Sequence, residues 1–377
     1  MAAITFDEKG DRKGADFGRV LKSRVADYFK TNKISQKADW RSWSKAVFFL
    51  GSAIAIYFTL VFGNVSSGTA VLLSIAAGLT LAGFGFNVMH DAIHRNFTAK
   101  SKLSKALYYS MDLFGASGNF YRIKHAIMHH TYTNVPGEDP DIEESPIIRM
   151  SPLQKHHGYH RYQIIYSTAL YFFLAFDWIW RGDYDRMARL KVCSLQMTKP
   201  TATEQGLFYF FKAFHAFYAL AVPLAFHPVK SVLACYVVAL ATAGLVLSIV
   251  FQIAHIHEGA SYPGPDESRQ IKGGWARHQV ITTANFATAN PFVCWYLGGL
   301  NFQIEHHLFP NINHVHYPKL NPIVAATCKE FGVNYREFSS VSSAIFSHYR
   351  QLYLLGSGKT EAELSGESAV SQTVSRS

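Results

Sequence analysis

The feature that most limits the fold of this chain is an uncharged run, residues 46–89, which contains no Asp, Glu, Lys or Arg. A hydrocarbon core about 30 Å thick is crossed by about 20 residues of helix, because each residue adds about 1.5 Å. The run is long enough for two crossings, and its one turn-like break is GNVSSG at 63–68. It therefore predicts a hairpin of two spanning helices, over about 46–64 and 68–89.

A second apolar block, residues 207–256, repeats this pattern. Its break is HPVK at 227–230, so we expect spans over about 207–227 and 231–254, with Lys212 reaching from the first of them to the membrane interface. Of the 377 residues, 49% are hydrophobic and 16% are charged, against about 25% charged in soluble domains. The chain is therefore predicted to be an all-α integral membrane protein with four transmembrane helices in two hairpins.

The distribution of Lys and Arg predicts the side of the membrane on which each loop lies. Residues 1–45 hold eleven Lys and Arg against six Asp and Glu, and 95–200 also hold many, whereas the two breaks hold none and one. The positive-inside rule then places both breaks away from the cytoplasm and both termini in it. We expect a cytosolic segment over 1–45 with an amphipathic helix near 17–29, a membrane domain over 46–355 with its cytosolic cap in 90–206 and 255–355, and a disordered tail over 356–377.

One further stretch, residues 162–180, is long enough to cross the membrane. It contains Asp177 and many aromatic residues and is flanked by Arg161 and Arg181, which is equally typical of an interfacial or re-entrant helix. If it crossed, the histidine-rich segments before and after it would be separated by the bilayer. We therefore interpret it as interfacial, an interpretation that depends on those histidines forming one site.

Histidines are abundant, 18 in all, and many gather in four short segments beside the predicted membrane exits. Residues four apart on a helix share a face, so His90 and His94 point the same way. On an α-helix His125 and His129 also share a face, with His130 about 100° round. His257 is ambiguous, and the other histidines are expected to be ordinary polar residues. The segments are HDAIH (His90, His94), HAIMHH (His125, His129, His130), QIAHIHE (His255) and QIEHH (Gln303, His306, His307).

Several histidine motifs at ligand spacing, all beside membrane exits, predict a metal centre. Zinc takes about four ligands, and eight imidazoles are too many for one first-row ion, so two metal ions are expected. Imidazole suits iron, copper, zinc and nickel, and a neutral nitrogen set suits a redox-active iron pair. The Glu-x-x-His repeats of soluble di-iron bundles are absent from the sequence. Neighbouring carboxylates are candidates to orient the outer ring nitrogens: Asp91, Asp139, Asp141, Glu258 and Glu305.

The segments HDAIH, HAIMHHTYTN and NFQIEHHLFP, in this order and beside apolar hairpins, resemble the three histidine boxes of membrane-bound fatty acyl desaturases. The Gln that opens the third box resembles the front-end subgroup, of delta-5 and delta-6 type, and in particular bacterial linoleoyl-CoA desaturase-like proteins without a fused cytochrome b5. The resemblance covers roughly residues 30–350 and implies four spanning helices under a cytosolic cap that holds two irons. It also implies a ligand set: His90, His94, His125, His129, His130, His255, Gln303, His306 and His307.

The resemblance implies O2-dependent removal of two hydrogens from neighbouring methylenes of a long, already unsaturated acyl chain, which gives a cis double bond and water. The chain needs a buried apolar tunnel, and the aromatic pieces 114–121, 171–180 and 292–302 are candidates to line it. The head group, of CoA or phospholipid, is expected on the cationic cytosolic surface. The candidate residues are Lys100, Lys102, Lys105, Arg122, Lys124 and Arg149.

Electrons are expected from an external donor, because no His-Pro-Gly-Gly haem motif occurs and 45 N-terminal residues are too few for a fused cytochrome b5 domain. The candidates are a ferredoxin and a free cytochrome b5, both typically acidic, which the net charge of +10 would steer to the protein. The same charge suits anionic lipid. We expect a bacterial inner-membrane protein with its site on the cytoplasmic side and no nucleic-acid partner.

Two other functions are compatible with the sequence. A lipid or sphingolipid hydroxylase on the same scaffold uses the same ligands, although Gln303 favours desaturation. A metal transporter should carry its histidines at mid-membrane along a path through the spans, whereas these lie at the membrane exits. The position of the double bond, the chain length and the identity of the donor do not follow from the sequence.

Overall fold

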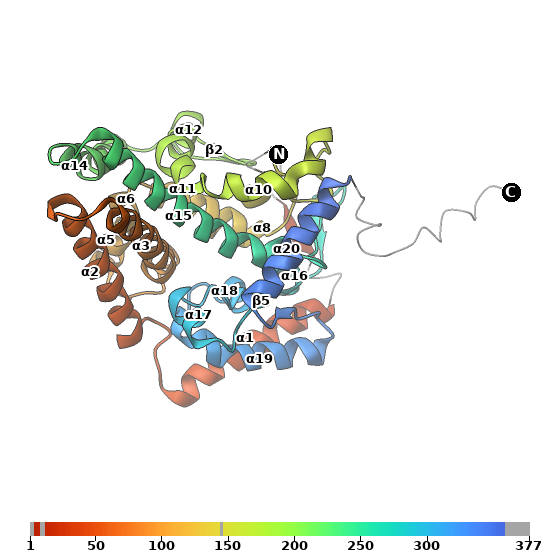
Figure 1. Ribbon diagram of the computed structural model, residues 1–377. Helices are drawn as coiled ribbons and strands as arrows, with labels where there is room; N and C mark the ends of the chain where they lie inside the picture. Colours follow the sequence, from red (N-terminus) through yellow and green to blue (C-terminus); the bar gives the residue numbers. More distant parts are fainter. Residues whose placement is uncertain (1–3, 8–11, 144–145, 359–377) are drawn as a thin grey trace.

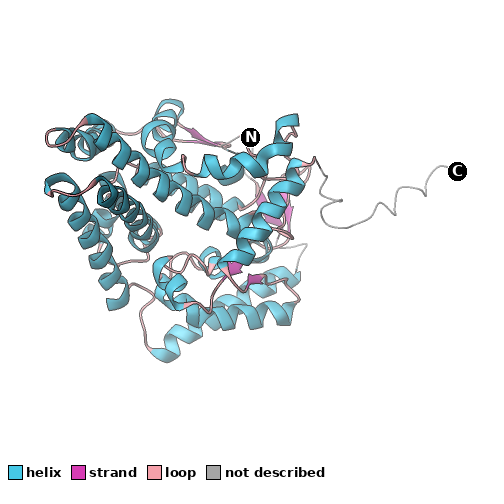
Figure 2. Cartoon of the chain, viewed as in Figure 1, coloured by secondary structure: helices cyan, strands magenta, loops and turns pink. Residues whose placement is uncertain are grey.

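The computed structural model describes residues 4–7, 12–143 and 146–358, and this part of the chain is mostly helical (Figures 1 and 2). Of the tail predicted to be disordered, residues 359–377 lie outside the described residues. Figure 1 shows α2 and α14 on one side of the molecule and α19 and α20 on the other. The helices fall into two groups, the apolar helices that include α2 and α14 and the more polar helices that include α19 and α20.

Four helices of the described chain are long and apolar enough to cross a membrane. The predicted spans overlap these four helices, so the predicted all-α membrane fold with two hairpins is confirmed. The first is α2 (Trp40–Phe62), and the second joins α3 (Ser67–Phe84), the π-helical turn η1 (Gly85–Met89) and α4 (His90–Ile93). The third joins α13 (Ala202–Ala216), η5 (Phe217–Ala221) and α14 (Val222–Leu224), and the fourth is α15 (Val229–His255).

The outer surface of these helices is apolar. Val47, Leu72 and Phe217 are more than half exposed. In water each square ångström of such surface would cost about 25 cal/mol, whereas in a lipid bilayer it costs nothing. The exposure of these side chains fits a lipid-facing surface.

The two hairpins are joined by a close crossing of α3 and α15. A Cβ atom at Gly78 would lie 2.4 Å from the backbone oxygen of Ala239 and 2.6 Å from Cβ of Thr242, so only glycine allows this approach. The last residue of α15 is His255, and the second span ends in α4, which contains His90. The crossing therefore holds together two helices that each deliver a histidine to the same region.

The ambiguous stretch 162–180 does not form one helix. It is divided into α10 (Gln163–Tyr171), α11 (Leu174–Asp177) and the π-helical turn η4 (Trp178–Gly182), each too short to cross a membrane. The break between α10 and α11 packs on α15, where a Cβ at Gly244 would be 2.8 Å from the backbone oxygen of Phe172. Its place at the membrane interface stays a prediction.

The remaining helices form a cap around the ends of the spans. Helix α1 (Arg12–Asn32) is the amphipathic helix expected near residues 17–29. It buries Phe17, Leu21, Val25 and Phe29, spaced four apart, against α16 and α19, and Figure 1 shows α1 beside α19. The other cap helices are α5 (Ser101–Tyr108), α6 (Ser110–Leu113), α7 (Gly118–Tyr121), η2 (Arg122–His129), α8 (His130–Tyr132), α9 (Pro140–Glu143), η3 (Gly158–Tyr162), α12 (Asp183–Arg189), α16 (Trp275–Ile281), α17 (Pro291–Tyr296), α18 (Gln303–Leu308), η6 (His314–His316), α19 (Tyr317–Phe331) and α20 (Val341–Gly356).

The described residues form three small strand pairs, two of which join distant parts of the chain. Strand β1 (Thr5–Asp7) runs parallel to β4 (Gln270–Lys272), and β5 (Asn285–Phe286) runs parallel to β6 (Glu337–Phe338). The third pair, β2 (Lys191–Val192) and β3 (Leu195–Gln196), is antiparallel. The first pair brings the N-terminal segment close to the histidines, because Tyr132, two residues after His130, donates a hydrogen bond to the backbone oxygen of Ile4 at 3.1 Å.

Candidate metal centre

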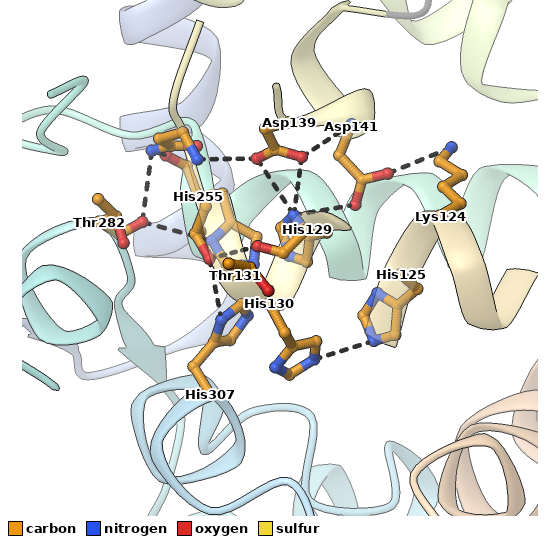
Figure 3. Close-up of polar contacts among 12 residues, drawn as sticks. Lys124, His125, His129, His130, Thr131, Asp139, Asp141, His255, Thr282 and His307 are labelled. Carbon is orange, nitrogen blue, oxygen red and sulfur yellow. Dashed lines mark hydrogen bonds and ion pairs between the residues drawn. The ribbon is translucent and has the colours of Figure 1, made fainter. Parts of the chain in front are cut away.

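Eight of the predicted ligands lie together in the interior of the molecule. His90 is in α4 and His94 follows it directly, while His125, His129 and His130 lie in η2 and α8. His255 ends α15, and the last two lie in α18. All eight are buried, and Figure 3 shows the second segment pointing toward His255 and His307. The predicted convergence of four separate histidine segments is therefore present in the structure.

The rings form several overlapping groups of possible metal ligands. One possible ligand atom from each of His90, His94, His125 and His306 lies within 4.8 Å of the others, and the same holds for His129, His255 and His307. His130 lies between the groups, with its ring centroid 4.5 Å from that of His306 and 4.3 Å from that of His307. The cluster of nitrogens is compatible with a metal centre, and its holding two ions stays a prediction.

The winding of the second segment differs from the α-helix assumed from the sequence. Residues 122–129 form a π-helix, in which the backbone nitrogen of His130 donates to the oxygen of His125, five residues earlier. The wider turn brings the Nε2 atoms of His125 and His130 to 3.2 Å, instead of placing His130 well round the helix. All three histidines of the segment therefore face the centre, and π-helical turns are common at functional sites.

The outer nitrogens of one group have partners that fix the rings. His129 Nδ1 lies 3.0 and 3.1 Å from the two carboxylate oxygens of Asp139, and 3.5 Å from Asp141 (Figure 3). His255 Nδ1 lies 3.3 Å from the backbone oxygen of Thr282. With Nδ1 as the donor, Nε2 keeps its lone pair and faces inward, which is the arrangement of metal-bound histidines.

Two polar residues beside the cluster were not identified from the sequence: Gln279 orients His307, and His314 contacts Asp91. Gln279, in α16, accepts through Oε1 from Nδ1 of His307 at 3.0 Å and from the hydroxyl of Thr133 at 3.0 Å. His314 Nδ1 lies 2.6 Å from Asp91, and its other nitrogen lies 3.1 Å from Nζ of Lys45. Nothing in the local pattern around Gln279 or His314 marks them, because their partners lie far away in the sequence.

The predicted role of the neighbouring carboxylates holds for only some of them. Asp139 and Asp141 contact His129, whereas Asp91 lies closer to His314 than to His90 Nδ1, at 2.6 against 3.9 Å. Glu305 precedes His306 but points away from it, because consecutive helical residues diverge by about 100°. Glu305 accepts hydrogen bonds from Asn285 at 2.7 Å and Tyr335 at 2.9 Å, and Glu258 pairs with Arg350 at 2.9 Å, so neither carboxylate orients a histidine of the cluster as expected.

The charge state of the rings suits metal binding. Burial, followed by the neighbouring rings, lowers the pKa of five of them well below the ordinary histidine value, so these rings are neutral at pH 7. Neutral imidazole is the form that binds a metal ion. For His129 burial also acts to lower the pKa, but the charges of Asp139 and Asp141 outweigh it and raise the pKa. The five rings are His94, His125, His130, His306 and His307.

Unpaired nitrogens test whether a metal fits. Within the described residues, the Nε2 atoms of His94, His306 and His307 are buried without a hydrogen-bond partner. His125 Nε2 also lies 3.0 Å from His90 Nε2 and 3.2 Å from His130 Nε2, so nitrogens of three rings meet at one place. A buried polar atom without a partner costs about 1–3 kcal/mol, and a cation bound among these lone pairs removes that cost. The donor set therefore fits metal ions bound by imidazole.

Two residues named from the sequence stand apart from these groups. His257 is buried, but its Nδ1 lies 3.1 Å from the backbone oxygen of Glu258 and its ring packs on Phe338, so it does not join the cluster. Gln303 is buried in the first turn of α18, one turn before His306. Contact between Gln303 and a metal remains a prediction.

An apolar cavity of about 60 Å³ adjoins His90. The predicted tunnel pieces 114–121 and 171–180 both contribute to its wall, whereas 292–302 does not. The cavity lies beside the histidines and contains almost no polar surface, so it suits a hydrocarbon chain. Its lining includes Met89, Phe114, Ala116, Ala175, Ile179 and Phe251.

A larger, cationic cavity of about 690 Å³ lies on the other side of residues 112–117. Four basic side chains line it against two acidic ones, Asp112 and Glu204. Of the predicted head-group residues, only Lys105 and Arg122 are among them, joined by Lys37 and Arg95. Two of the other candidates are engaged elsewhere: Lys124 lies 3.2 Å from Asp141, and Arg149 is buried and donates to the backbone oxygen of Leu355 at 2.7 Å.

The fold and the site define an integral membrane protein with a buried cluster of histidines that could hold a metal. Comparison with known families narrows this class, because the model of the fatty acid desaturase family matches residues 66–339, which include all eight histidines. The chain belongs to the fatty acid desaturase family. It is therefore an oxidoreductase of lipid metabolism, and the resemblance seen in the histidine boxes is confirmed.

Curated relatives agree with this assignment. An acyl-lipid (8-3)-desaturase of Physcomitrium patens is 36% identical over 95% of this chain and 75% of its own length. An sn-1 linoleoyl-lipid 6-desaturase of Synechocystis sp. is 35% identical over 90% of this chain and 95% of its own length. An acyl-lipid (8-3)-desaturase of Mortierella alpina is 33% identical, with 90% and 78% covered.

Proposed function

We propose that this protein is an O2-dependent acyl-lipid desaturase with a di-iron centre that introduces a cis double bond into a long, already unsaturated chain at a front-end, delta-5 or delta-6, position. The observation that carries the proposal is the convergence of eight buried histidines beside an apolar cavity. The proposed iron ligands are His90, His94, His125, His129, His130, His255, Gln303, His306 and His307.

In the net reaction the acyl chain loses two hydrogens, and O2 takes up these two hydrogens, two electrons from a donor and two protons to give two molecules of water. Bound iron supplies this oxidation, which no amino-acid side chain can perform. The chain's own residues hold and orient the ligands, as Asp139 and Gln279 do for His129 and His307. The apolar cavity positions one bond and keeps water away from it.

The names of the relatives support a lipid-linked acyl group as the substrate, in place of acyl-CoA. We place its head group in the cationic cavity, where Arg95, Lys105 and Arg122 offer charge to an anionic head group. The acyl chain then passes residues 112–117 into the apolar cavity beside His90. The two cavities thus divide the polar and apolar parts of one substrate.

The donor and the location complete the proposal. The net charge of +10 supports docking of an acidic donor, a ferredoxin or a free cytochrome b5. The excess of Lys and Arg in residues 1–45 supports a site on the cytoplasmic side of a bacterial inner membrane.

The test is expression in a host that accumulates linoleate, with the fatty acids identified by mass spectrometry and the iron of the purified protein measured. A desaturase product is two hydrogens lighter than the fed acid, whereas a hydroxylase product is one oxygen heavier. His125→Ala should abolish the product, and His227→Ala, in the turn between the last two spans, should not. Wild-type protein with stoichiometric zinc and no iron would contradict the di-iron assignment.

A further inference from the structure

A buried lysine in the third span holds the segment between the two cavities. Lys212 was expected to reach the membrane interface, and this was wrong: its Nζ is buried and lies 2.8 Å from Oδ2 of Asp183. It also donates to the backbone oxygens of Gly115 at 2.6 Å and Ile179 at 2.8 Å. All three ammonium hydrogens therefore have acceptors within the protein.

The same ion pair also contacts this segment at Ser117. Oδ2 of Asp183 accepts a hydrogen bond from the backbone nitrogen of Ser117 at 2.7 Å. Between the two contacts, Gly115 has a φ of +92°, and a Cβ there would lie 2.7 Å from the ring of His215. Hydrogen bonds from Lys212 and to Asp183, together with the close packing of His215, thus fix the backbone of residues 115–117.

Residues 112–117, which we call the partition segment, form a wall of both cavities. Asp112 and Ser117 line the cationic cavity, whereas Phe114 and Ala116 line the apolar cavity. Ile179, whose backbone oxygen accepts from Lys212, also lines the apolar cavity. A shift of the ion pair would therefore move the wall between the cationic cavity, where we place the head group, and the apolar cavity, where we place the acyl chain.

Stability alone does not account for this ion pair. Taking two charges out of water costs several kcal/mol per ion, and an apolar pair of the same volume is often as stable or more stable. The methylenes between the head group and the existing double bond of the acyl chain carry no polar group that would select one of them over the next. The bond that reacts is then chosen by its distance from the anchored head group, and small displacements change reactivity greatly.

We propose that the Lys212–Asp183 pair is a positioning device that sets the site of the double bond by fixing the partition segment between the two cavities. The inference rests on the proposed function. It assigns no direct contact with substrate to either residue, since both act through the backbone of 115–117. It predicts that the pair controls which bond is oxidised, with no effect on how iron is bound.

The first test is the double variant Lys212→Met with Asp183→Asn, which removes the charges of both partners at nearly constant volume, while Arg186, whose Nη1 lies 3.5 Å from Oδ1 of Asp183, keeps its own charge. Iron content should match that of the wild type, while the ratio of the main positional isomer to its neighbours should fall by roughly tenfold or more. The isomers are read from mass spectra of oxazoline derivatives. Lys230→Met, at the exposed start of α15, is the matched control and should leave the ratio unchanged.

A second variant decides the matter if the double variant does not fold. Ala116→Val enlarges the partition on the chain side and leaves the ion pair intact, so it should shift the isomer ratio with iron retained. If wild-type protein forms no unsaturated product, the proposed function fails. If wild type desaturates but neither variant changes the isomer, or if the change appears only with loss of iron, the positioning role is overturned.

Discussion

Nδ1 of His129 lies 3.0 and 3.1 Å from the two carboxylate oxygens of Asp139, and both side chains are fully buried. The carboxylate also accepts hydrogen bonds from the backbone nitrogens of Asn134 and Asp141, at 2.8 and 2.9 Å, which prevents it from turning away. The ring of His129 is therefore held with Nε2 toward the other histidines. Loss of this contact should weaken metal binding more than it lowers the stability of the fold.

The first prediction follows from this contact. Asp139→Asn keeps the shape of the side chain but removes the charge that orients His129, and loss of such a partner typically weakens metal binding by about 10–100-fold. We expect iron to be lost at chelator concentrations that the wild type withstands, with the thermal unfolding of the apo-protein little changed. Asp185→Asn, at an exposed ion pair with Arg189, is the control. Equal chelator resistance in Asp139→Asn and wild type would show that His129 needs no such support.

The second prediction concerns Gln279, the partner of His307. Gln279→Met removes the acceptor for Nδ1 of His307, so the ring loses its fixed tautomer. The group formed by His129, His255 and His307 should then bind metal less tightly than the group around His90. We expect iron per protein to fall from about two toward about one, with activity lost, as measured by metal analysis of purified protein. Gln196→Met, at an exposed position, should retain both ions.

Much of this site follows from local rules in the sequence. The four spans follow from the length of apolar helix that crosses a bilayer, and helical spacing predicts that His90 and His94 share one face. What spacing does not give is the winding of 122–129, because a π-helix is selected by its tertiary surroundings. The pattern alone assigned His130 to a different direction from His125, and the structure brings their Nε2 atoms to 3.2 Å.

Partners that are distant in the sequence could not be predicted. Gln279 lies 28 residues from His307, and Asp183 lies 29 residues from Lys212, so no periodicity links either pair. Adjacency also misled in one case, because Glu305 sits beside His306 in the chain but points to Tyr335. Lys212 is buried and does not reach the membrane interface, because α13 packs against the loop at Gly115. This packing does not follow from the sequence.

The third prediction tests the apolar cavity. Ala175 is buried in its wall, and Ala175→Phe would fill the roughly 60 Å³ beside the histidines without touching any of them. We expect product formation to drop at least about tenfold while iron stays bound, because the acyl chain no longer reaches the centre. Shorter-chain substrates should be affected less than long ones. Ala225→Phe, at an exposed position in the far turn, controls for the added ring.

The fourth prediction tests the cationic cavity. Arg122→Gln removes one of the charges that we assign to the head group, so the KM for an anionic lipid should rise about tenfold with kcat nearly unchanged. A neutral glycolipid carrying the same acyl chain should show little change. The matched control is Lys102→Gln, which does not line the cavity. A fall in kcat with constant KM would instead assign Arg122 to the support of η2, the π-helix that begins with it.

The fifth prediction compares two glycines in the membrane helices. Gly78→Ala places a Cβ 2.4 Å from the backbone oxygen of Ala239, so α3 and α15 must separate at a cost of about 1–3 kcal/mol. Gly51→Ala, in α2, meets nothing within 4 Å and should stabilise its helix by up to about 1 kcal/mol. Thermal unfolding in detergent should therefore shift in opposite directions for the two variants. Because α3 continues into the helix that holds His90 while α15 ends at His255, Gly78→Ala should also lose iron, and Gly51→Ala should keep it.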